Sequence, residues 1–452
     1  MAASKEQIDS FIEQSVDGYM AELTELCAIP SVSAKGENMR ECADLVERIL
    51  QRHGFETKQF ETAGFPVVYG HLDGESERTI LLYNHYDVQP EEPLELWDSP
   101  PFEPTIRDGA LYARGAKDDK GEFIARLAAV DAVREANGGK LPCGVTFVVE
   151  GQEETGSPHI AQFVRENLGI LKSHGSIWEE GGVSPDGRPI NLLGVRGVLS
   201  VEFNVQTLNR DAHSGGASKL PNAAWRLVWA LASLKGPDEK ILIPGFYDKA
   251  YPPTELDMQH FRDLPSYEEQ ERTDFGIKEF LRGATGLDYK SAEFQPTCNI
   301  QGFESGYYGK GMKTVIPAKA MAKVDFRLIP DQDPDDIYEK LCKHLQDQGF
   351  SDVEVTRLGA MWPAKATADN PLVKLTAQTG EEVYGKPSMI VPITGGSSPV
   401  YAFAEPLDIP VVTAGVGYIG SRTHSPNEHV RLSDFVQGSK HIARIIDGFA
   451  DI

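Results

Sequence analysis

The sequence predicts an α/β protein in which a discontinuous domain is interrupted by an inserted α+β domain. First, a chain of 452 residues is too long for one ordinary hydrophobic core. Second, short apolar runs rich in β-branched residues alternate with segments of helical periodicity over the first part of the chain. Third, the segment after residue 197 begins with apolar–polar alternation and continues as a mixture of strands and helices. We therefore expect residues 1–196 and 366–452 to form one domain and residues 197–365 to form the other.

The expected elements follow in order along the chain. Their periodicity predicts helices over 5–26, 39–54 and 122–137, and strands over 67–71, 79–83 and 144–149. The inserted domain is expected to hold strands over 198–207, 297–300, 314–316 and 320–328, helices over 223–234 and 334–349, and a polar insertion over 254–288. After it we expect a helix over 370–384 and a buried strand over 410–415.

The composition argues against several classes of protein. Hydrophobic residues make up 40% of the chain and charged residues 25%, which is typical of a soluble globular protein. The formal net charge of −24 argues against binding to nucleic acid or to an anionic membrane surface, because both require a basic surface. The N-terminus shows no apolar signal segment and no apolar stretch is long enough to span a bilayer, so we expect a cytoplasmic protein. The five cysteines include no Cys-x-x-Cys pair, so neither a disulfide scaffold nor a thiolate zinc site is indicated.

Two adjacent acids end the apolar strand over 144–149. Glu153 and Glu154 follow it after Glu150, Gly151 and Gln152, and Gly156 comes two residues later. In a hydrolytic metal site one such carboxylate can hold a cation while its neighbour moves a proton. Taken alone, an acidic pair in a loop is more often simply solvated, so the pair gains meaning only from the residues elsewhere in the chain.

Two further acidic strings are candidates for the same chemistry. His85 and Asp87 are two residues apart on an extended segment and point to the same face, so Asp87 is placed to orient the imidazole, directly or through the local turn. An edge-strand histidine with a polar neighbour is the alternative. Asp118 and Asp119 precede a predicted helix, where they are either a carboxylate that bridges two cations or an ordinary N-cap cluster.

These strings belong to an ordered set. The set is His85-x-Asp87, Arg114-Gly115-Ala116-x-Asp118-Asp119-Lys120-Gly121, Glu153-Glu154-x-Gly156-Ser157, Ala212-His213-Ser214-Gly215, Lys313-Thr314-Val315-Ile316-Pro317, Phe326-Arg327-Leu328-Ile329-Pro330, Gly395-Gly396-Ser397 and Thr423-His424-Ser425-x-Asn427-Glu428. Each string is short and common, but the order is specific and spans nearly the whole chain. It resembles the M20 family of metallopeptidases, and most closely its dipeptidase branch, which includes the carnosinase-like and Cys-Gly dipeptidases.

The resemblance implies a two-metal catalytic domain with an inserted lid and dimerisation domain. His85 would bind the first metal ion, with Asp87 orienting its ring. Asp118 would bridge both ions, and in the family the peptide bond that follows this residue is cis. The first ion needs one more acid from the segment 176–182, where many relatives have aspartate. We expect Glu179 in that role, with Glu180 as the alternative.

The second ion and the proton-transfer group come from the remaining motifs. The resemblance implies that Glu154 and His424 bind the second ion and that Glu153 is the general base. Imidazole and carboxylate ligands without a thiolate suit divalent ions, with Zn²⁺ expected first and Mn²⁺ or Co²⁺ next. Two such ions can share a hydroxide at neutral pH, from which Glu153 would take a proton and pass it to the leaving amine.

The inserted domain supplies the remaining candidate residues. Read locally, His213 is a surface-loop histidine and Arg327 a solvent-facing arginine. The resemblance implies that His213 reaches the active site of a partner subunit in a homodimer and stabilises the tetrahedral oxyanion. It also implies that Arg327 clamps the C-terminal carboxylate of the substrate. Thr314, Ser397 and Gly396 are expected to make further substrate contacts.

Three classes of function follow. The first is a two-metal hydrolase that cleaves dipeptides or short peptides with a free C-terminal carboxylate. The second is an amidohydrolase that deacylates N-acyl amino acids at the same metal pair. The third, a scaffold without activity, is disfavoured because no metal-ligand position is missing.

Overall fold

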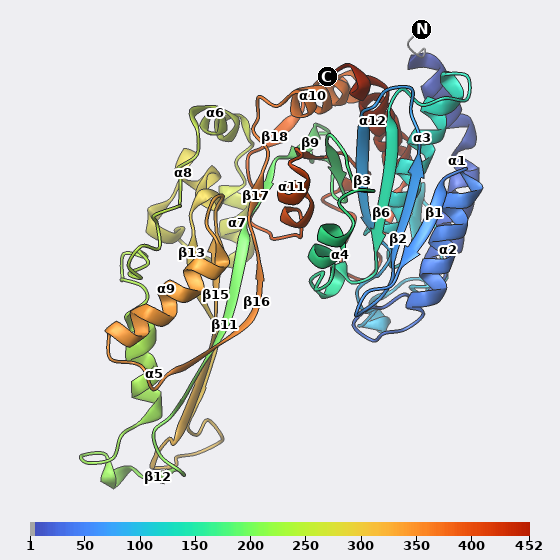
Figure 1. The fold of residues 1–452 in the computed structure, drawn as a ribbon. Coiled ribbons are helices and arrows are strands. Elements are labelled where there is room, and N and C mark those ends of the chain that lie inside the picture. Colours follow the sequence, from blue (N-terminus) through green and yellow to red (C-terminus); the bar gives the residue numbers. More distant parts are fainter. Residues whose placement is uncertain (1–4) are drawn as a thin grey trace. The chain divides into compact units, whose positions relative to one another are not determined.

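The computed structural model describes residues 5–452, which form two compact units (Figure 1). The first unit contains the described residues up to Gly194, together with Lys365–Pro392 and Ala402–Ile452. The second contains Val195–Ala364 and Ile393–Tyr401. Residues 393–401, expected in the first domain, belong to the second unit. The chain passes from one unit to the other within β10 (Gly194–Val195) and β17 (Ala364–Lys365), and again after Pro392 and after Tyr401.

The first unit is built on a six-stranded sheet in the order β1-β2-β6-β3-β7-β19. Its strands are β1 (Glu56–Phe60), β2 (Val67–Leu72), β3 (Thr79–His85), β6 (Gly144–Glu150), β7 (Ser176–Trp178) and β19 (Val411–Thr413). β3 is parallel to both β6 and β7, and β7 is parallel to β19. The carboxyl ends of these four strands therefore lie at one edge of the sheet, which is where α/β proteins bind their ligands.

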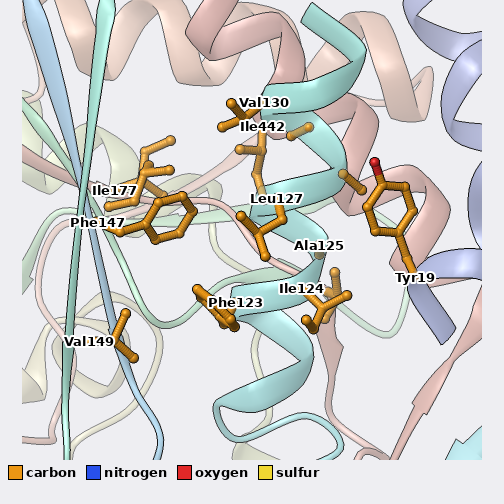
Figure 2. Packing of buried hydrophobic residues seen from close by; sticks show 14 of the residues in the cluster. Tyr19, Phe123, Ile124, Ala125, Leu127, Val130, Phe147, Val149, Ile177 and Ile442 are labelled. Carbon is orange, nitrogen blue, oxygen red and sulfur yellow. The ribbon is translucent and has the colours of Figure 1, made fainter. Parts of the chain in front are cut away.

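Helices and sheet of the first unit share one hydrophobic core. The core includes residues of α1 (Lys5–Cys27), α2 (Met39–Arg52), α3 (Lys120–Ala136) and α12 (Leu432–Gly448). Figure 2 shows Phe123 and Leu127 of α3 facing Phe147 and Ile177 of the sheet. α3 is buried without a break over Lys120–Val133, so its first residues are held firmly beside the strand ends.

The other face of the sheet is covered by aromatic contacts. Tyr83 stacks on Trp178 with ring centroids 3.8 Å apart, and Phe403 of α11 (Tyr401–Leu407) meets both rings edge-on. The remaining helices of this unit are α4 (Ile160–Glu166) and α10 (Pro371–Tyr384). Two small sheets, β18-β9-β8-β20 and β21-β5-β4, complete it; their strands are β4 (Thr105–Arg107), β5 (Ala110–Tyr112), β8 (Gly182–Val183), β9 (Pro189–Leu192), β18 (Met389–Val391), β20 (Gly417–Tyr418) and β21 (His429–Arg431).

The second unit contains an antiparallel sheet in the order β13-β15-β11-β16. Its strands are β11 (Gly197–Gln206), β13 (Thr297–Ser305), β15 (Lys319–Leu328) and β16 (Glu354–Met361), accompanied by the short pair β12 (Ala212–His213) and β14 (Val315–Ile316). Burial alternates along β11, as its sequence pattern predicts, and the buried side packs with α5 (Ala223–Ala232) and α9 (Pro334–Asp347). The polar insertion contains α6 (Glu255–Asp263), α7 (Glu268–Phe275) and α8 (Leu287–Lys290). Over residues 5–452, none of the helices has the length and apolar character needed to cross a membrane.

Candidate metal centre

The candidate ligands lie where the parallel strands of the first unit end. His85 is the last residue of β3, Glu154 lies in the 3₁₀ turn Glu153–Thr155 after β6, and Glu179 directly follows β7. Asp118 lies just before α3, and His424 lies in the loop between β20 and β21. His85, Glu154 and Glu179 therefore meet at one edge of the sheet because β3, β6 and β7 are parallel neighbours.

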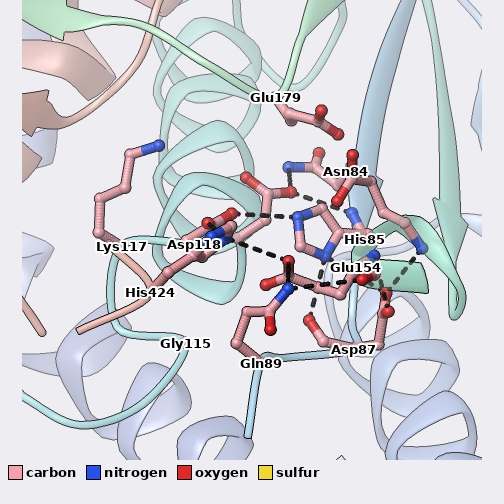
Figure 3. A network of polar contacts seen from close by, with 12 residues as sticks. Asn84, His85, Asp87, Gln89, Gly115, Lys117, Asp118, Glu154, Glu179 and His424 are labelled. Carbon is pink, nitrogen blue, oxygen red and sulfur yellow. Dashed lines mark hydrogen bonds and ion pairs between the residues drawn. The ribbon is translucent and has the colours of Figure 1, made fainter. Parts of the chain in front are cut away.

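The carboxylate of Asp118 lies between two imidazoles (Figure 3). His85 Nε2 is 3.1 Å from Asp118 Oδ1, and His424 Nε2 is 3.0 Å from Asp118 Oδ2. His424 Nε2 is also 3.1 Å from Glu154 Oε2, and one ligand atom each from Asp118, Glu154 and His424 lie within 4.8 Å of one another. Two ligand atoms on one tetrahedral zinc ion, each about 2.0–2.1 Å from it, lie about 3.3 Å apart, so these residues fit shared cations. The peptide bond from Asp118 to Asp119 is cis, as the resemblance implies.

Asp87 orients both the imidazole and the acidic pair. His85 Nδ1 is 3.0 Å from the backbone carbonyl oxygen of Asp87 and 3.3 Å from its Oδ1, which leaves Nε2 for a cation. The two carboxylate oxygens of Asp87 also accept hydrogen bonds from the backbone N–H groups of Glu153 at 3.2 Å and Glu154 at 3.0 Å. The predicted contact with the ring is therefore present, and the contact with the acidic pair was not anticipated.

Burial and neighbouring charge perturb the acids of this centre. Burial raises the pKa of Glu153 to about 8, and the negative charges of Glu154 and Asp118 add to the effect while His85 opposes it. Burial also raises the pKa of Glu179, and the charge of Glu153 adds to it. A pKa raised in this way shows that the carboxylate is costly to ionise where it is buried, and a bound cation would offset that cost.

The choice between the two neighbouring glutamates after β7 follows from their exposure. Glu179 is 5% exposed, and its charge interacts with those of Glu153 and His85, whereas Glu180 is exposed. Trp178 Nε1 donates to Glu179 Oε1 at 3.0 Å. Glu179 is not a member of the close group formed by Asp118, Glu154 and His424. Its burial supports Glu179 over Glu180 as the acid for the first ion.

The motif set recognised in the sequence is matched by comparison with known proteins. A model of the family described as "Peptidase family M20/M25/M40" matches residues 81–448. The chain belongs to this peptidase family. This M20 peptidase is 27% identical to the Cys-Gly metallodipeptidase dug1 of Schizosaccharomyces pombe, over 100% of both chains, and 28% identical to the Beta-Ala-His dipeptidase of Mus musculus, over 84% of this chain and 78% of the relative. It also matches the crystal structure of the M20 family metallo-carboxypeptidase Sso-CP2 from Sulfolobus solfataricus with a TM-score of 0.89 and 34% identity, covering 96% of this chain and 99% of that one.

In the second unit of this M20 peptidase, the predicted substrate residues form two pairs. His213 Nε2 is 3.4 Å from Thr314 Oγ1, and His213 Nδ1 accepts from the backbone N–H of Gly215 at 3.0 Å. One guanidinium nitrogen of Arg327 donates to Ser397 Oγ at 2.8 Å. Gly396 lies beside Ser397, and its carbonyl oxygen accepts from the backbone N–H of Arg196 at 2.9 Å. His213 and Thr314 are exposed, so both are accessible on this unit.

Gln89 and Asp119 make contacts at this centre that the sequence did not predict. Gln89 Nε2 donates to Glu154 Oε2 at 2.8 Å. Asp119 is buried and accepts from Asn84 Nδ2 at 2.6 Å and from the backbone N–H of His85 at 3.0 Å, so it holds the main chain of His85 at the end of β3. Gln89 stands two residues after Asp87, and that spacing was the available signal. No spacing rule links Asp119 to Asn84.

Proposed function

We propose that this M20 peptidase hydrolyses dipeptides and short peptides that carry a free C-terminal carboxylate, using two divalent metal ions. The observation that carries the proposal is the Asp118 carboxylate between the imidazoles of His85 and His424. Relatives named as Cys-Gly metallodipeptidase and Beta-Ala-His dipeptidase, both similar along most of this chain, support the dipeptide class.

The proposed ligand sets follow from the residues around Asp118. His85, Asp118 and Glu179 would hold one ion, and Asp118, Glu154 and His424 the other. Bound ions supply Lewis acidity at the scissile carbonyl and lower the pKa of a coordinated water. Zn²⁺ suits this set of imidazole and carboxylate ligands best, with Mn²⁺ or Co²⁺ as alternatives.

Proton transfer is assigned to Glu153. The carboxylate takes a proton from the attacking water and delivers it to the nitrogen of the leaving amine. The neighbouring Glu154 cannot do this while it binds a cation, because coordination lowers its basicity. Two adjacent acids therefore have different roles, and Asp87 holds the backbone of both.

Recognition of the substrate is assigned to the second unit. Arg327 would bind the C-terminal carboxylate of the peptide, with Ser397 orienting the guanidinium through its 2.8 Å contact. Thr314 and Gly396 would make further contacts with the peptide. We also propose that the chain forms a homodimer in which His213 stabilises the tetrahedral oxyanion in the active site of the partner subunit. A cytoplasmic location stays a prediction of the sequence.

Two other reactions use the same centre. The first is removal of the last residue from longer peptides, and the similarity to the metallo-carboxypeptidase of Sulfolobus solfataricus supports it. Deacylation of N-acyl amino acids is the second, and it needs no substrate amine. All three reactions place a carboxylate on the leaving side of the scissile bond, so Arg327 alone does not distinguish them.

Substrate length and the free amine do distinguish them. We would assay the metal-loaded chain with Ala-Ala, carnosine, Cys-Gly, Ala-Ala-Ala, N-acetyl-alanine and C-terminally amidated Ala-Ala. The proposal predicts the highest kcat/KM for dipeptides and little turnover of the amide. A preference for the tripeptide would indicate a carboxypeptidase, and a preference for N-acetyl-alanine would indicate the amidohydrolase.

A further inference from the structure

Glu428 is a fully buried acid whose carboxylate accepts hydrogen bonds from four donors of one loop. Its Oε1 accepts from the backbone N–H groups of Lys117 at 3.1 Å and Asp118 at 2.9 Å. Its Oε2 accepts from the guanidinium of Arg114 at 2.7 Å and the backbone N–H of Gly115 at 3.1 Å. Gly115 has φ of +84°, and a Cβ there would lie 2.8 Å from a methyl carbon of Val88, so glycine is required for this turn. We call the loop Arg114–Asp118 with the Glu428 carboxylate the Glu428 clasp.

The Glu428 clasp joins three segments that carry metal-ligand candidates. Arg114 donates to the carbonyl oxygen of Pro90 at 3.1 Å, and this segment follows His85. Arg114 also donates to the carbonyl oxygen of Ser425 at 3.4 Å, directly after His424. The third segment is the loop itself, which ends at the bridging candidate. The ion pair between Arg114 and Glu428 therefore connects the main chain near His85 with the main chain near His424.

We propose that Glu428 is a positioning residue of the metal centre, which fixes the loop of Asp118 against the turn of His424 so that both side chains reach one ion. The inference rests on the proposed metal centre. Because Glu428 Oε1 binds the backbone N–H of Asp118 itself, moving this carboxylate moves the main chain from which the bridging side chain projects. Groups that orient metal ligands in this way typically change metal affinity by about 10–100-fold when they are removed.

The donors of the clasp require both oxygens of a carboxylate. Every partner of Glu428 in the clasp is a donor, and an ionised carboxylate only accepts. In Glu428→Gln the side-chain –NH₂ would face either the two N–H groups at Oε1 or the donors at Oε2, so one pair of contacts is lost. Glu428→Asp keeps the negative charge beside Arg114, but its side chain is one methylene shorter. This variant therefore tests whether the length of the side chain matters when its charge is retained.

The test is the zinc affinity of the full chain after its metal has been stripped. We would titrate Zn²⁺ in competition with a chromogenic chelator for the wild type, Glu428→Gln and Glu428→Asp, and record far-UV circular dichroism to verify folding. The matched control is Asp9→Asn, which breaks an ion pair of 2.9 Å with the buried Arg444 between α1 and α12. We expect both Glu428 variants to bind Zn²⁺ about 10–100-fold more weakly than wild type. The control is expected to lose thermal stability without losing affinity.

The outcomes separate this inference from the proposed function. Folded Glu428 variants with wild-type zinc affinity would overturn the positioning role alone, and so would an equal loss of affinity in Asp9→Asn. A wild-type chain that binds none of Zn²⁺, Mn²⁺ and Co²⁺ would overturn the metal centre and this inference with it. If Glu428→Gln does not fold, Glu428→Asp decides the question, because it retains the charge that the buried guanidinium of Arg114 requires.

Discussion

Replacement of Glu153 by glutamine should abolish most of the turnover while leaving the metal ions in place. Glutamine keeps the shape of the side chain and the hydrogen bond from the backbone N–H of residue 153 to Asp87, at 3.2 Å in the wild type, so the loop should not move. The amide cannot accept and release the proton that the reaction transfers. General acid–base groups contribute about 10²–10⁴-fold to the rate, equivalent to about 3–5 kcal/mol in the barrier. We therefore expect kcat to decrease by a factor of about 10²–10⁴.

The assay is kcat for Ala-Ala at saturating substrate, together with metal content by elemental analysis of the same sample. The matched control is Glu154→Gln, which replaces the carboxylate oxygen that lies 3.1 Å from His424 Nε2 and accepts from Gln89 at 2.8 Å. This control should lose metal as well as activity. Loss of metal from Glu153→Gln with retention in Glu154→Gln would show that the two roles are exchanged. Undiminished kcat in Glu153→Gln would refute its role in proton transfer.

Two further predictions concern substrate recognition and pH. Arg327→Met should lower kcat/KM for Ala-Ala by about 10–100-fold, because a hydrogen bond to a charged group contributes about 1.5–3 kcal/mol. The same substitution should barely change the residual rate for amidated Ala-Ala, which lacks the carboxylate. An equal loss for both substrates would argue against a carboxylate clamp. Burial opposes protonation of His53, but hydrogen bonds to Asp131 and Glu22 outweigh it and raise the pKa of His53 to about 9. Since this folded-state pKa lies above the ordinary value of 6.5, the stabilisation is complete below about pH 6.5 and is lost as the pH rises through about 9. The difference in Tm between wild type and His53→Gln should therefore be large at pH 6 and small at pH 10, and a difference independent of pH would contradict the assignment.

Local sequence patterns predicted the elements that carry the candidate site. A run of apolar residues ending in an acid or an imidazole marked β3 and β6, and the structure brings His85, Asp118, Glu154 and His424 together. The identity of the acid after β7 could not be derived, because Glu179 and Glu180 differ only in burial, which depends on the tertiary fold. The family resemblance supplied the roles that spacing alone left open.

Long-range pairing limited the rest of the prediction. The Arg114–Glu428 ion pair joins residues 314 positions apart, and no periodic pattern relates them. Residues 393–401 belong to the second unit although they follow α10 of the first, so sequence order misassigned them. By contrast, α12 was missed although its signal was present, since Phe435, Ile442, Ile445 and Ile446 are buried positions at helical spacing.

The most direct test of the account is the number of zinc ions bound per chain, measured by elemental analysis of the wild type and of Asp118→Asn after dialysis against dilute Zn²⁺. Because Asp118 is the carboxylate proposed to contact both ions, we predict two ions in the wild type and loss of both in the variant. One ion in the wild type, or two ions retained by Asp118→Asn, would contradict a pair of cations bridged by this side chain.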